Sequence, residues 1–279
     1  MAKKVSLINM KGGVGKSTLT VNLAWTFASF LRLRVLVVDL DPQFNASQYL
    51  LGVNRYAKEI LDAKKPTIWH IFEQNIRTPT GKTELSNPQD AIVTVAQPYG
   101  GGSVDLVPSR LELALSLRNS GQKEKQLSGF IAQVEGKYDL ILIDCAPTES
   151  VLTTAAYLSS NYLLVPVKPE YLSSIGLPLL ANSMEEFQAN YPNHDLELAG
   201  IVFNHASDYV PEEKRSKQEV RQVAAQRSWH VFDAEVSFSR SYPKGAREGK
   251  PIYATSHSRS KKVINFLTFA KELRGRIGL

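Results

Sequence analysis

A glycine-rich segment near the start of the chain, residues 9–18 (NMKGGVGKST), most constrains how this sequence can fold. The apolar run before it is typical of a short buried strand, and the apolar spacing of residues 19–28 is typical of a helix packed on a sheet. Strand, glycine-rich turn and helix form the context that a phosphate-binding loop requires. Glycines let the backbone turn so that successive N–H groups point at phosphate oxygens, and the helix N-terminus adds partial positive charge.

Two side chains of this loop carry the predicted chemistry. Lys16 is expected to contact the β- and γ-phosphates of a nucleotide, and the Ser17 hydroxyl to bind Mg²⁺. The general pattern G-x-x-x-x-G-K-[ST] has a glycine where this chain has Met10, and a second lysine, Lys11, follows at once. A glycine-rich turn with nearby lysines is the alternative interpretation.

Composition limits the class of protein. Hydrophobic residues make up 43% of the 279 residues and charged residues 22%, which is ordinary for a globular protein large enough for a substantial core. No apolar run approaches the length of about 20 residues that spans a membrane, and no secretory signal is expected at the N-terminus. The single cysteine, Cys145, excludes an internal disulfide framework, so we expect a cytoplasmic protein. The net charge of +6 permits an anionic partner.

Two aspartates follow the next apolar run, residues 35–38, which is typical of a central parallel strand buried on both faces. Asp39 and Asp41 come at its C-terminal end, where open α/β sheets hold their ligands. Two residues apart on an extended chain, both would face the same side and could share a cluster of Mg²⁺, phosphate and water. In the alternative interpretation they cap a turn before Pro42.

Two later strands also end in polar side chains. Residues 140–143 are apolar and lead into Asp144, the Walker B arrangement, in which the aspartate holds the water shell of the metal. Cys145 is interpreted as a small filler and not as a nucleophile. Asn204 follows the apolar stretch 198–203 and either pairs with the edge of adenine or is a plain turn residue. The alternation of strands and helices predicts one doubly wound, mostly parallel α/β sheet flanked by helices, in a single domain over residues 1–279.

Basic residues concentrate late in the chain. Lys214, Lys217 and Arg221 have helical i, i+3, i+7 spacing and would share a face, and Arg240 and Arg247 follow. Such a patch would give DNA binding that is independent of sequence and sensitive to salt, whereas a solvated surface is the alternative for any single cluster. The apolar stripe of residues 263–273 favours a helix packed on the sheet over a membrane anchor.

Three motifs occur in order: K-G-G-V-G-K-[ST] at residues 11–17, D-x-D-P-Q at 39–43 and D-x-x-P at 144–147. Together they resemble the ParA/MinD family of deviant Walker A ATPases, P-loop proteins that include the small, Soj-like ParA partition ATPases. In that family the extra lysine, here Lys11, reaches across an ATP-sandwich homodimer to the nucleotide of the other subunit. The second aspartate, here Asp41, positions the attacking water.

The resemblance implies a Mg²⁺-dependent ATPase whose ATP-bound homodimer binds nonspecific DNA, with Arg240 the best single candidate for a DNA contact. A ParB-like or adaptor protein would stimulate turnover, and the cycle would drive partition or positioning of plasmid, chromosome or protein cargo. The protein would then be cytoplasmic and associated with the nucleoid when ATP is bound, and no membrane partner is expected. Two alternatives remain: a MinD-like membrane-associated positioning ATPase, and a nucleotide-dependent scaffold with little turnover.

The predicted site residues fall into four sets. The catalytic residues are Lys11, Lys16 and Asp41; the nucleotide-binding residues are Lys11, Gly12, Gly13, Val14, Gly15, Lys16, Ser17, Thr18 and Asn204; the metal site comprises Ser17, Asp39 and Asp144; and the DNA-binding residues are Arg240, Lys214, Lys217, Arg221 and Arg247.

Overall fold

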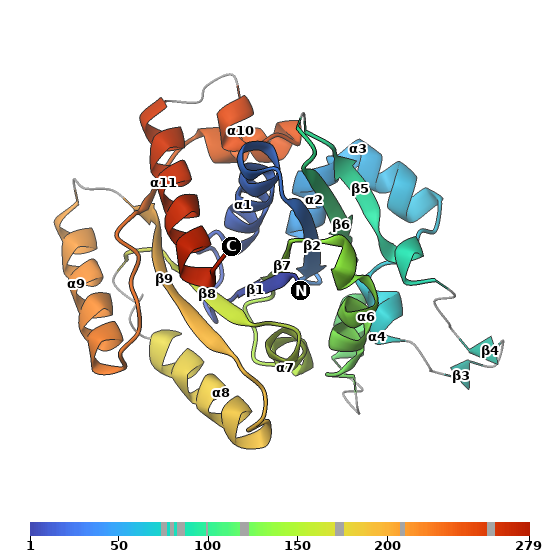
Figure 1. Ribbon diagram of the computed structural model, residues 1–279, viewed down its shortest axis with the longest axis horizontal. Coiled ribbons are helices and arrows are strands. Elements are labelled where there is room, and N and C mark those ends of the chain that lie inside the picture. The colour runs from blue at the N-terminus through green and yellow to red at the C-terminus, as the bar shows by residue number, and fades with distance from the viewer. Residues whose placement is uncertain are drawn as a thin grey trace.

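A single large sheet forms the centre of the protein (Figure 1). The computed structural model describes residues 1–73, 77–78, 81–82, 87–98, 100–117, 123–170, 176–206, 210–255 and 260–279. Within these residues, eight strands pair in the order β10-β9-β8-β1-β7-β2-β6-β5, and every neighbouring pair except β5 with β6 is parallel. The strands are β1 (Lys3–Leu7), β2 (Arg34–Leu40), β5 (Val93–Ala96), β6 (Ser103–Val107), β7 (Leu140–Cys145), β8 (Tyr162–Val167), β9 (Glu197–Ala206) and β10 (Val236–Ser237).

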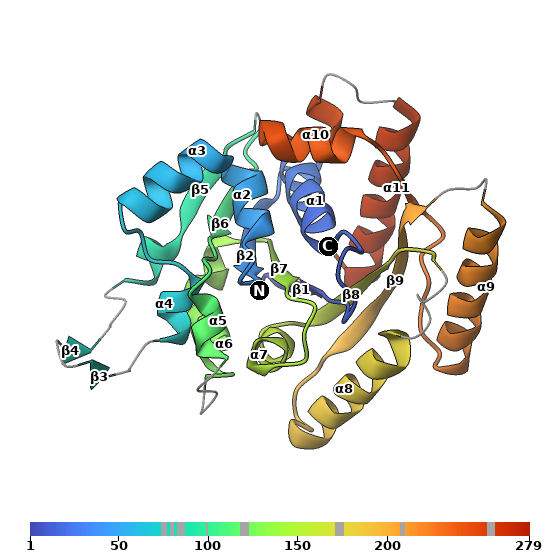
Figure 2. The ribbon, with the colours of Figure 1, turned by 180° about the vertical axis from the view of Figure 1, so that it is seen from behind.

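Helices cover both faces of the sheet, as Figures 1 and 2 show from opposite sides. One face carries α1 (Lys16–Leu31), α2 (Asn45–Leu51), α3 (Val53–Tyr56), α10 (Ser241–Glu248) and α11 (Ser260–Ile277). The other carries α4 (Ile68–Phe72), α5 (Leu113–Ser116), α6 (Gln126–Val134), α7 (Val151–Leu158), α8 (Gly176–Asn190) and α9 (Pro211–Gln226). Shorter elements are a small hairpin of β3 (Arg77–Thr78) and β4 (Gly81–Lys82), a π-helical turn (Ala57–Asp62) and 3₁₀ turns at Pro88–Ala91, Glu135–Lys137 and Ile252–Ala254.

The central strands contribute to two separate cores. In β2, Val35 and Val37 pack under α1 and α2, whereas Leu36, Val38 and Leu40 pack against the helices of the opposite face. All five side chains are fully buried. This confirms the prediction of a strand buried on both faces, because successive side chains of a strand point to opposite sides. The predicted α/β class, a doubly wound and mostly parallel sheet, is confirmed.

The C-terminal helix completes the face that carries α1. The apolar stripe predicted within residues 263–273 lies in α11, which buries Phe266, Phe269 and Leu273 against β9, β10 and α1. Its apolar side therefore belongs to the protein core. Within the described ranges, no helix combines the length and the apolar composition needed to cross a bilayer.

Strand direction determines where a ligand site can form. Because β1, β2, β7, β8 and β9 run parallel, their carboxyl ends meet at one edge of the sheet, where α/β folds bind ligands. Asp39 on β2 and Asp144 on β7 are partners in the strand register, so the two carboxylates lie side by side at that edge.

Candidate functional site

The glycine-rich loop lies at this edge, between β1 and α1. Gly13 and Gly15 have left-handed backbones, with φ of 74° and 83°. Residues with a Cβ rarely adopt this conformation, which is the physical reason for glycine at both positions. Gly15 is the N-cap residue of α1 and offers no side-chain oxygen to the N–H groups of the first turn. Those N–H groups are thus left for an anion.

The ammonium of Lys16 lies inside the loop. Its Nζ donates to the carbonyl oxygens of Asn9 at 3.1 Å and of Lys11 at 3.3 Å. Burial lowers the pKa of Lys16, and the negative charge of Asp144 opposes that change. Phosphate oxygens are stronger acceptors for an ammonium than neutral carbonyls, so a bound phosphate can replace these contacts. The arrangement suits a lysine that binds phosphate.

Two buried asparagines from different strand ends hold the loop in place. Asn9 donates to the carbonyl of Pro166 at 2.8 Å and accepts from the N–H of Lys11 at 2.8 Å. Asn204 donates its amide to the carbonyl of Val14 at 2.7 Å, and its Oδ1 accepts from the N–H of the next residue. Both amide groups are therefore engaged with the main chain. Asn204, predicted either to pair with adenine or to occupy a turn, is buried and hydrogen-bonded to the loop.

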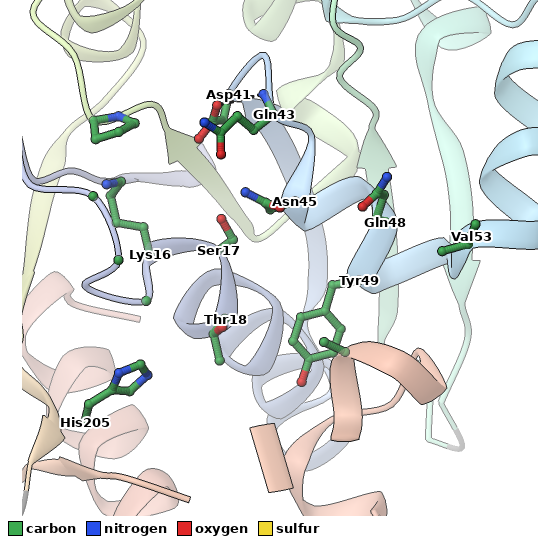
Figure 3. A pocket seen from close by; sticks show the side chains of 15 residues that line it. Lys16, Ser17, Thr18, Asp41, Gln43, Asn45, Gln48, Tyr49, Val53 and His205 are labelled. Atoms are coloured by element: carbon green, nitrogen blue, oxygen red, sulfur yellow. Dashed lines mark hydrogen bonds between the residues drawn. The ribbon is translucent and has the colours of Figure 1, made fainter. Parts of the chain in front are cut away.

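A cavity of about 520 Å³ opens over the loop. Figure 3 shows Asp41 and Gln43 at one end of it, above Lys16 and Ser17, with His205 and Tyr49 toward the other end. Several predicted site residues thus line one space although they come from different elements. Its lining is Gly12, Gly13, Gly15, Lys16, Ser17, Thr18, Asp41, Gln43, Asn45, Gln48, Tyr49, Val53, Pro147, His205 and Ala246.

The carboxylate of Asp144 is fully buried and neighbours Ser17 and Thr20 of α1. The hydroxyl of Thr20 donates to its Oδ1 at 3.3 Å, whereas Oδ2 is buried without a well-formed hydrogen bond among the described residues. Burial raises the pKa of Asp144, while the Ser17 hydroxyl favours the charged form. A cation would satisfy the unpaired oxygen. No described group of three or more His, Cys, Asp or Glu side chains forms a metal cage, but Mg²⁺ bound together with phosphate needs only one or two protein carboxylates and water. The residues present therefore fit Mg²⁺.

Asp39 differs from Asp41 in what it contacts. Its Oδ2 accepts from the N–H and the hydroxyl of Ser47, at 2.7 and 2.6 Å, and its Oδ1 accepts from the N–H of Asp41 at 3.3 Å. Burial and the charge of Asp144 raise its pKa. These hydrogen bonds join Asp39 to the turn after β2 and to the first turn of α2. They are the contacts expected of an aspartate that caps a turn. Asp41 lines the cavity, and its Oδ1 accepts from the N–H of Gln43 at 2.9 Å.

The second lysine of the loop points elsewhere. Lys11 does not belong to the cavity lining; its Nζ lies 2.6 Å from Oε1 of Glu170, which follows β8. Glu170 was not predicted as a site residue, because nothing in its local sequence pattern identifies it. Cys145 is fully buried, and burial raises its pKa to about 12, which agrees with a filler and not with a nucleophile.

The predicted basic residues lie on two helices. Lys214, Lys217 and Arg221 are on α9, as their spacing indicates. Lys214 and Arg221 are exposed, whereas the side chain of Lys217 is only 12% exposed and its Nζ lies 2.5 Å from Oε2 of Glu235. Arg240, the N-cap residue just before α10, and Arg247, in the last turn of α10, are both exposed. Lys217 is therefore held by Glu235 of the same chain, whereas Lys214 and Arg221 face solvent.

Several residues of the cavity wall were not predicted from the sequence. Tyr49 of α2 and His205, which follows Asn204 on β9, both line it. Burial lowers the pKa of His205, so its imidazole favours the neutral form. His205 directly follows Asn204, at the end of a predicted strand, and this position could have identified it from the sequence. Tyr49 had no such signal, because α2 reaches the cavity only through the tertiary fold.

Known proteins resemble this chain over most of its length. A family model described as an AAA domain matches residues 2–198. The chain is 30% identical to an uncharacterised protein of Methanocaldococcus jannaschii, over 89% of this chain and 90% of that protein. It is 28% identical to the chromosome-partitioning ATPase Soj of Treponema pallidum, over 90% of this chain and 89% of that protein.

Solved structures give the same fold. The ATP complex of McdA from Cyanothece superposes with a TM-score of 0.80 at 15% identity, and covers 100% of this chain and 97% of that one. The fold, the three motifs and the similarity to Soj lead to one conclusion. This chain belongs to the ParA/MinD family of deviant Walker A ATPases and is a Soj-like member of it.

Proposed function

We propose that this protein hydrolyses ATP in the cavity over residues 9–18 and uses the cycle to position a cargo. The observation that carries the proposal is the convergence of Lys16, Ser17 and Asp41 on one cavity, with the buried Oδ2 of Asp144 next to Ser17. Three strands that are far apart in the sequence bring these groups together. The Soj relative is named as a chromosome-partitioning ATPase, which supports the same activity here.

Each group has a role in this proposal. The first-turn N–H groups of α1 and the ammonium of Lys16 would hold the phosphates. Ser17 and Asp144 would hold Mg²⁺, which when bound neutralises the charge that develops on the phosphates. Asp41, hydrogen-bonded to the Gln43 N–H, would orient the attacking water. Asp39 keeps this turn in place and so acts on the metal site through its neighbours.

An Asp41→Ala variant tests turnover. We expect ATP binding with little hydrolysis, because the phosphate loop is untouched. Asp62→Ala, which removes an exposed aspartate at the end of the π-helical turn, is the matched control and should hydrolyse ATP as the wild type does. Equal hydrolysis by Asp41→Ala and wild type would contradict the assigned role. Absence of hydrolysis in the wild type would instead favour a nucleotide-dependent scaffold.

A homodimer with ATP at its interface is part of the proposal. Lys11 sits at the rim of the loop, about a third exposed, and does not line the cavity of its own subunit. This position suits a lysine that contacts the nucleotide of a second subunit. Sedimentation of wild type and Lys11→Ala with ATP, ADP or no nucleotide measures dimer formation. We expect dimers only for the wild type with ATP.

Nonspecific DNA is the proposed surface on which the dimer assembles. The exposed side chains of Lys214, Arg221, Arg240 and Arg247 support this, and dimerisation would double their number. Contacts of this kind weaken steeply with salt. Binding to duplex DNA across a salt series, with and without ATP, tests the idea with Arg240→Ala. Lys137→Ala, at an exposed site before β7 on the opposite edge of the sheet, is the charge-matched control.

The remaining parts of the proposal are inferred from the family. A ParB-like or adaptor protein would stimulate hydrolysis, the cargo would be a plasmid, a chromosome or a protein assembly, and the protein would be cytoplasmic and nucleoid-associated. A MinD-like membrane role lacks support from α11, since Phe266, Phe269 and Leu273 are buried in the core. Cosedimentation with anionic liposomes and ATP tests that alternative, and we expect no binding.

A further inference from the structure

The structure pairs the ammonium of Lys11 with a carboxylate of the same chain. Nζ of Lys11 lies 2.6 Å from Oε1 of Glu170, and Nζ of Lys168 lies 2.8 Å from Oε2 of the same side chain. Each oxygen of Glu170 therefore has its own cation. Because β1 and β8 are neighbours in the sheet, the loop after β1 and the segment after β8 meet at its carboxyl edge. The contact follows from this strand order.

The main chain of Lys11 is held at the same time. Its N–H donates to Oδ1 of Asn9, and its carbonyl accepts from Nζ of Lys16. Only the side chain of Lys11 can therefore move without rebuilding the loop. An ammonium that is 2.6 Å from a carboxylate on its own subunit is not directed at a phosphate of another. The ion pair and a contact across a dimer are alternatives.

Glu170 is itself attached to the helix that carries exposed basic residues. Its carbonyl accepts a hydrogen bond from the hydroxyl of Ser216 at 2.9 Å, and Ser216 is buried on α9. Lys214 and Arg221 lie on the same helix. The carboxylate therefore sits on a segment anchored to α9, and displacing it from Lys11 alters a contact next to this helix.

We propose that Glu170 is a positioning residue that holds Lys11 within its own subunit until ATP and a second subunit replace it. The proposal rests on the dimeric ATPase function given above. A triphosphate carries more negative charge than one carboxylate and can displace it from the ammonium. Glu170 would therefore oppose dimerisation at low ATP and keep the free protein monomeric.

The expected effect of this ion pair on dimerisation is limited by its exposure to solvent. The side chains of Lys11 and Glu170 are 32% and 38% exposed, so water screens the pair. Pairs of this kind change equilibria by about two- to fivefold. The adjacent lysines hold the pKa of Glu170 below its ordinary range, so the carboxylate is charged near neutral pH. We expect Glu170→Gln to lower the ATP concentration for half-maximal dimerisation by about two- to fivefold.

The contact can be measured directly in the absence of nucleotide. Acylation of Lys11 with an N-hydroxysuccinimide ester, followed by peptide mass spectrometry, reports whether the ammonium is held. Glu170→Gln should raise labelling of Lys11 by a similar factor and leave that of Lys137 unchanged. Glu185→Gln is the matched control, because it breaks a 2.8 Å ion pair with Arg227 and removes the same charge. It should change neither labelling of Lys11 nor dimerisation.

A second variant guards against a general disturbance of the loop. Lys168→Gln removes the cation beside Oε2 of Glu170 and leaves the ion pair between Oε1 and Lys11, so labelling of Lys11 should stay at or below the wild-type rate. Glu170→Asp, which keeps the charge, should restore part of the protection. Thermal unfolding of each variant without nucleotide confirms that the fold is intact.

The outcomes separate this inference from the proposed function. Unchanged labelling of Lys11 in folded Glu170→Gln would overturn the inference, whatever the protein does with ATP. Weaker dimerisation of Glu170→Gln would also overturn it, because Glu170 would then assist assembly. If labelling rises as expected but the wild type never dimerises with ATP, the ion pair stands and the dimeric function fails.

Discussion

The side-chain amide of Asn204 donates a 2.7 Å hydrogen bond to the carbonyl of Val14, 190 residues earlier in the chain. This contact joins the end of β9 to the phosphate loop. Both residues are buried, so water cannot take the place of either partner if the hydrogen bond is lost. The shape of the loop therefore depends on a strand from the other end of the sequence.

Asn204→Ala is expected to destabilise the protein even without nucleotide. It leaves the Val14 carbonyl without its donor, and an unsatisfied buried group costs about 1–3 kcal/mol. Urea unfolding without nucleotide measures the loss. Asn182→Ala, at an exposed position of α8, is the control and should unfold near the wild-type midpoint. Identical midpoints for Asn204→Ala and wild type would mean that this hydrogen bond does not stabilise the fold.

Gly15→Ala is expected to damage the same contact from the other side. The added Cβ would lie 2.4 Å from Nδ2 of Asn204, and φ of 83° is strained for alanine by about 1–2 kcal/mol. We expect lower stability and loss of nucleotide binding, measured by thermal unfolding with and without ADP. At Gly12 a Cβ meets nothing within 4 Å, so Gly12→Ala should keep the wild-type stability without nucleotide. A Gly15→Ala protein that melts with the control would disprove the clash.

The capping of α4 predicts a pH dependence of stability. Nδ1 of His70 accepts from the N–H of Thr67 at 3.0 Å, and burial lowers the pKa of His70, as does the charge of Arg110. Between this lowered value and about 6.5, the unfolded chain binds more protons than the folded one. The contribution of His70 is therefore complete above about pH 6.5 and is lost as the pH falls toward the folded-state pKa.

His70→Gln tests this contribution. Glutamine at this position keeps an acceptor for the capping N–H but does not titrate. The unfolding free energy of the variant should fall less than that of the wild type between about pH 7 and pH 5. His205 is present in both proteins, so its own titration cancels in the comparison. Parallel pH profiles would show that His70 does not contribute.

Two lysines of α9 are expected to behave differently. Lys217 lies 2.5 Å from Glu235, with its ammonium also 5.9 Å from the centre of the Phe203 ring, whereas Lys214 is exposed. Lys217→Ala should lower stability by about 1 kcal/mol and leave the salt dependence of DNA binding unchanged. Lys214→Ala should keep stability and reduce the salt slope by about 0.9 for each subunit of the bound dimer, the value for one phosphate contact. Similar salt slopes of DNA binding for the two variants would contradict the different roles assigned to Lys214 and Lys217.

Asp39 and Asp41 have different partners although one local pattern groups them. Alternation along a strand predicts that both carboxylates face the same side. β2 ends at Leu40, and the chain turns before α2, with a left-handed backbone at Phe44. Asp39 accepts hydrogen bonds from Ser47 at the start of that helix, whereas Asp41 lines the cavity. The fold of this turn decides which partner each carboxylate has, and the alternation does not specify it.

The sequence by itself determined the phosphate loop, the buried central strands, the helical spacing on α9 and the α/β class. These features depend on neighbouring residues: glycine conformation, apolar runs and helical periodicity are local properties. Only the tertiary structure decided that Asn204 donates a hydrogen bond to Val14, that Tyr49 and His205 line the cavity and that Glu170 pairs with Lys11. These contacts depend on the order of the strands in the sheet, with β8 beside β1, and no local pattern specifies which strands become neighbours.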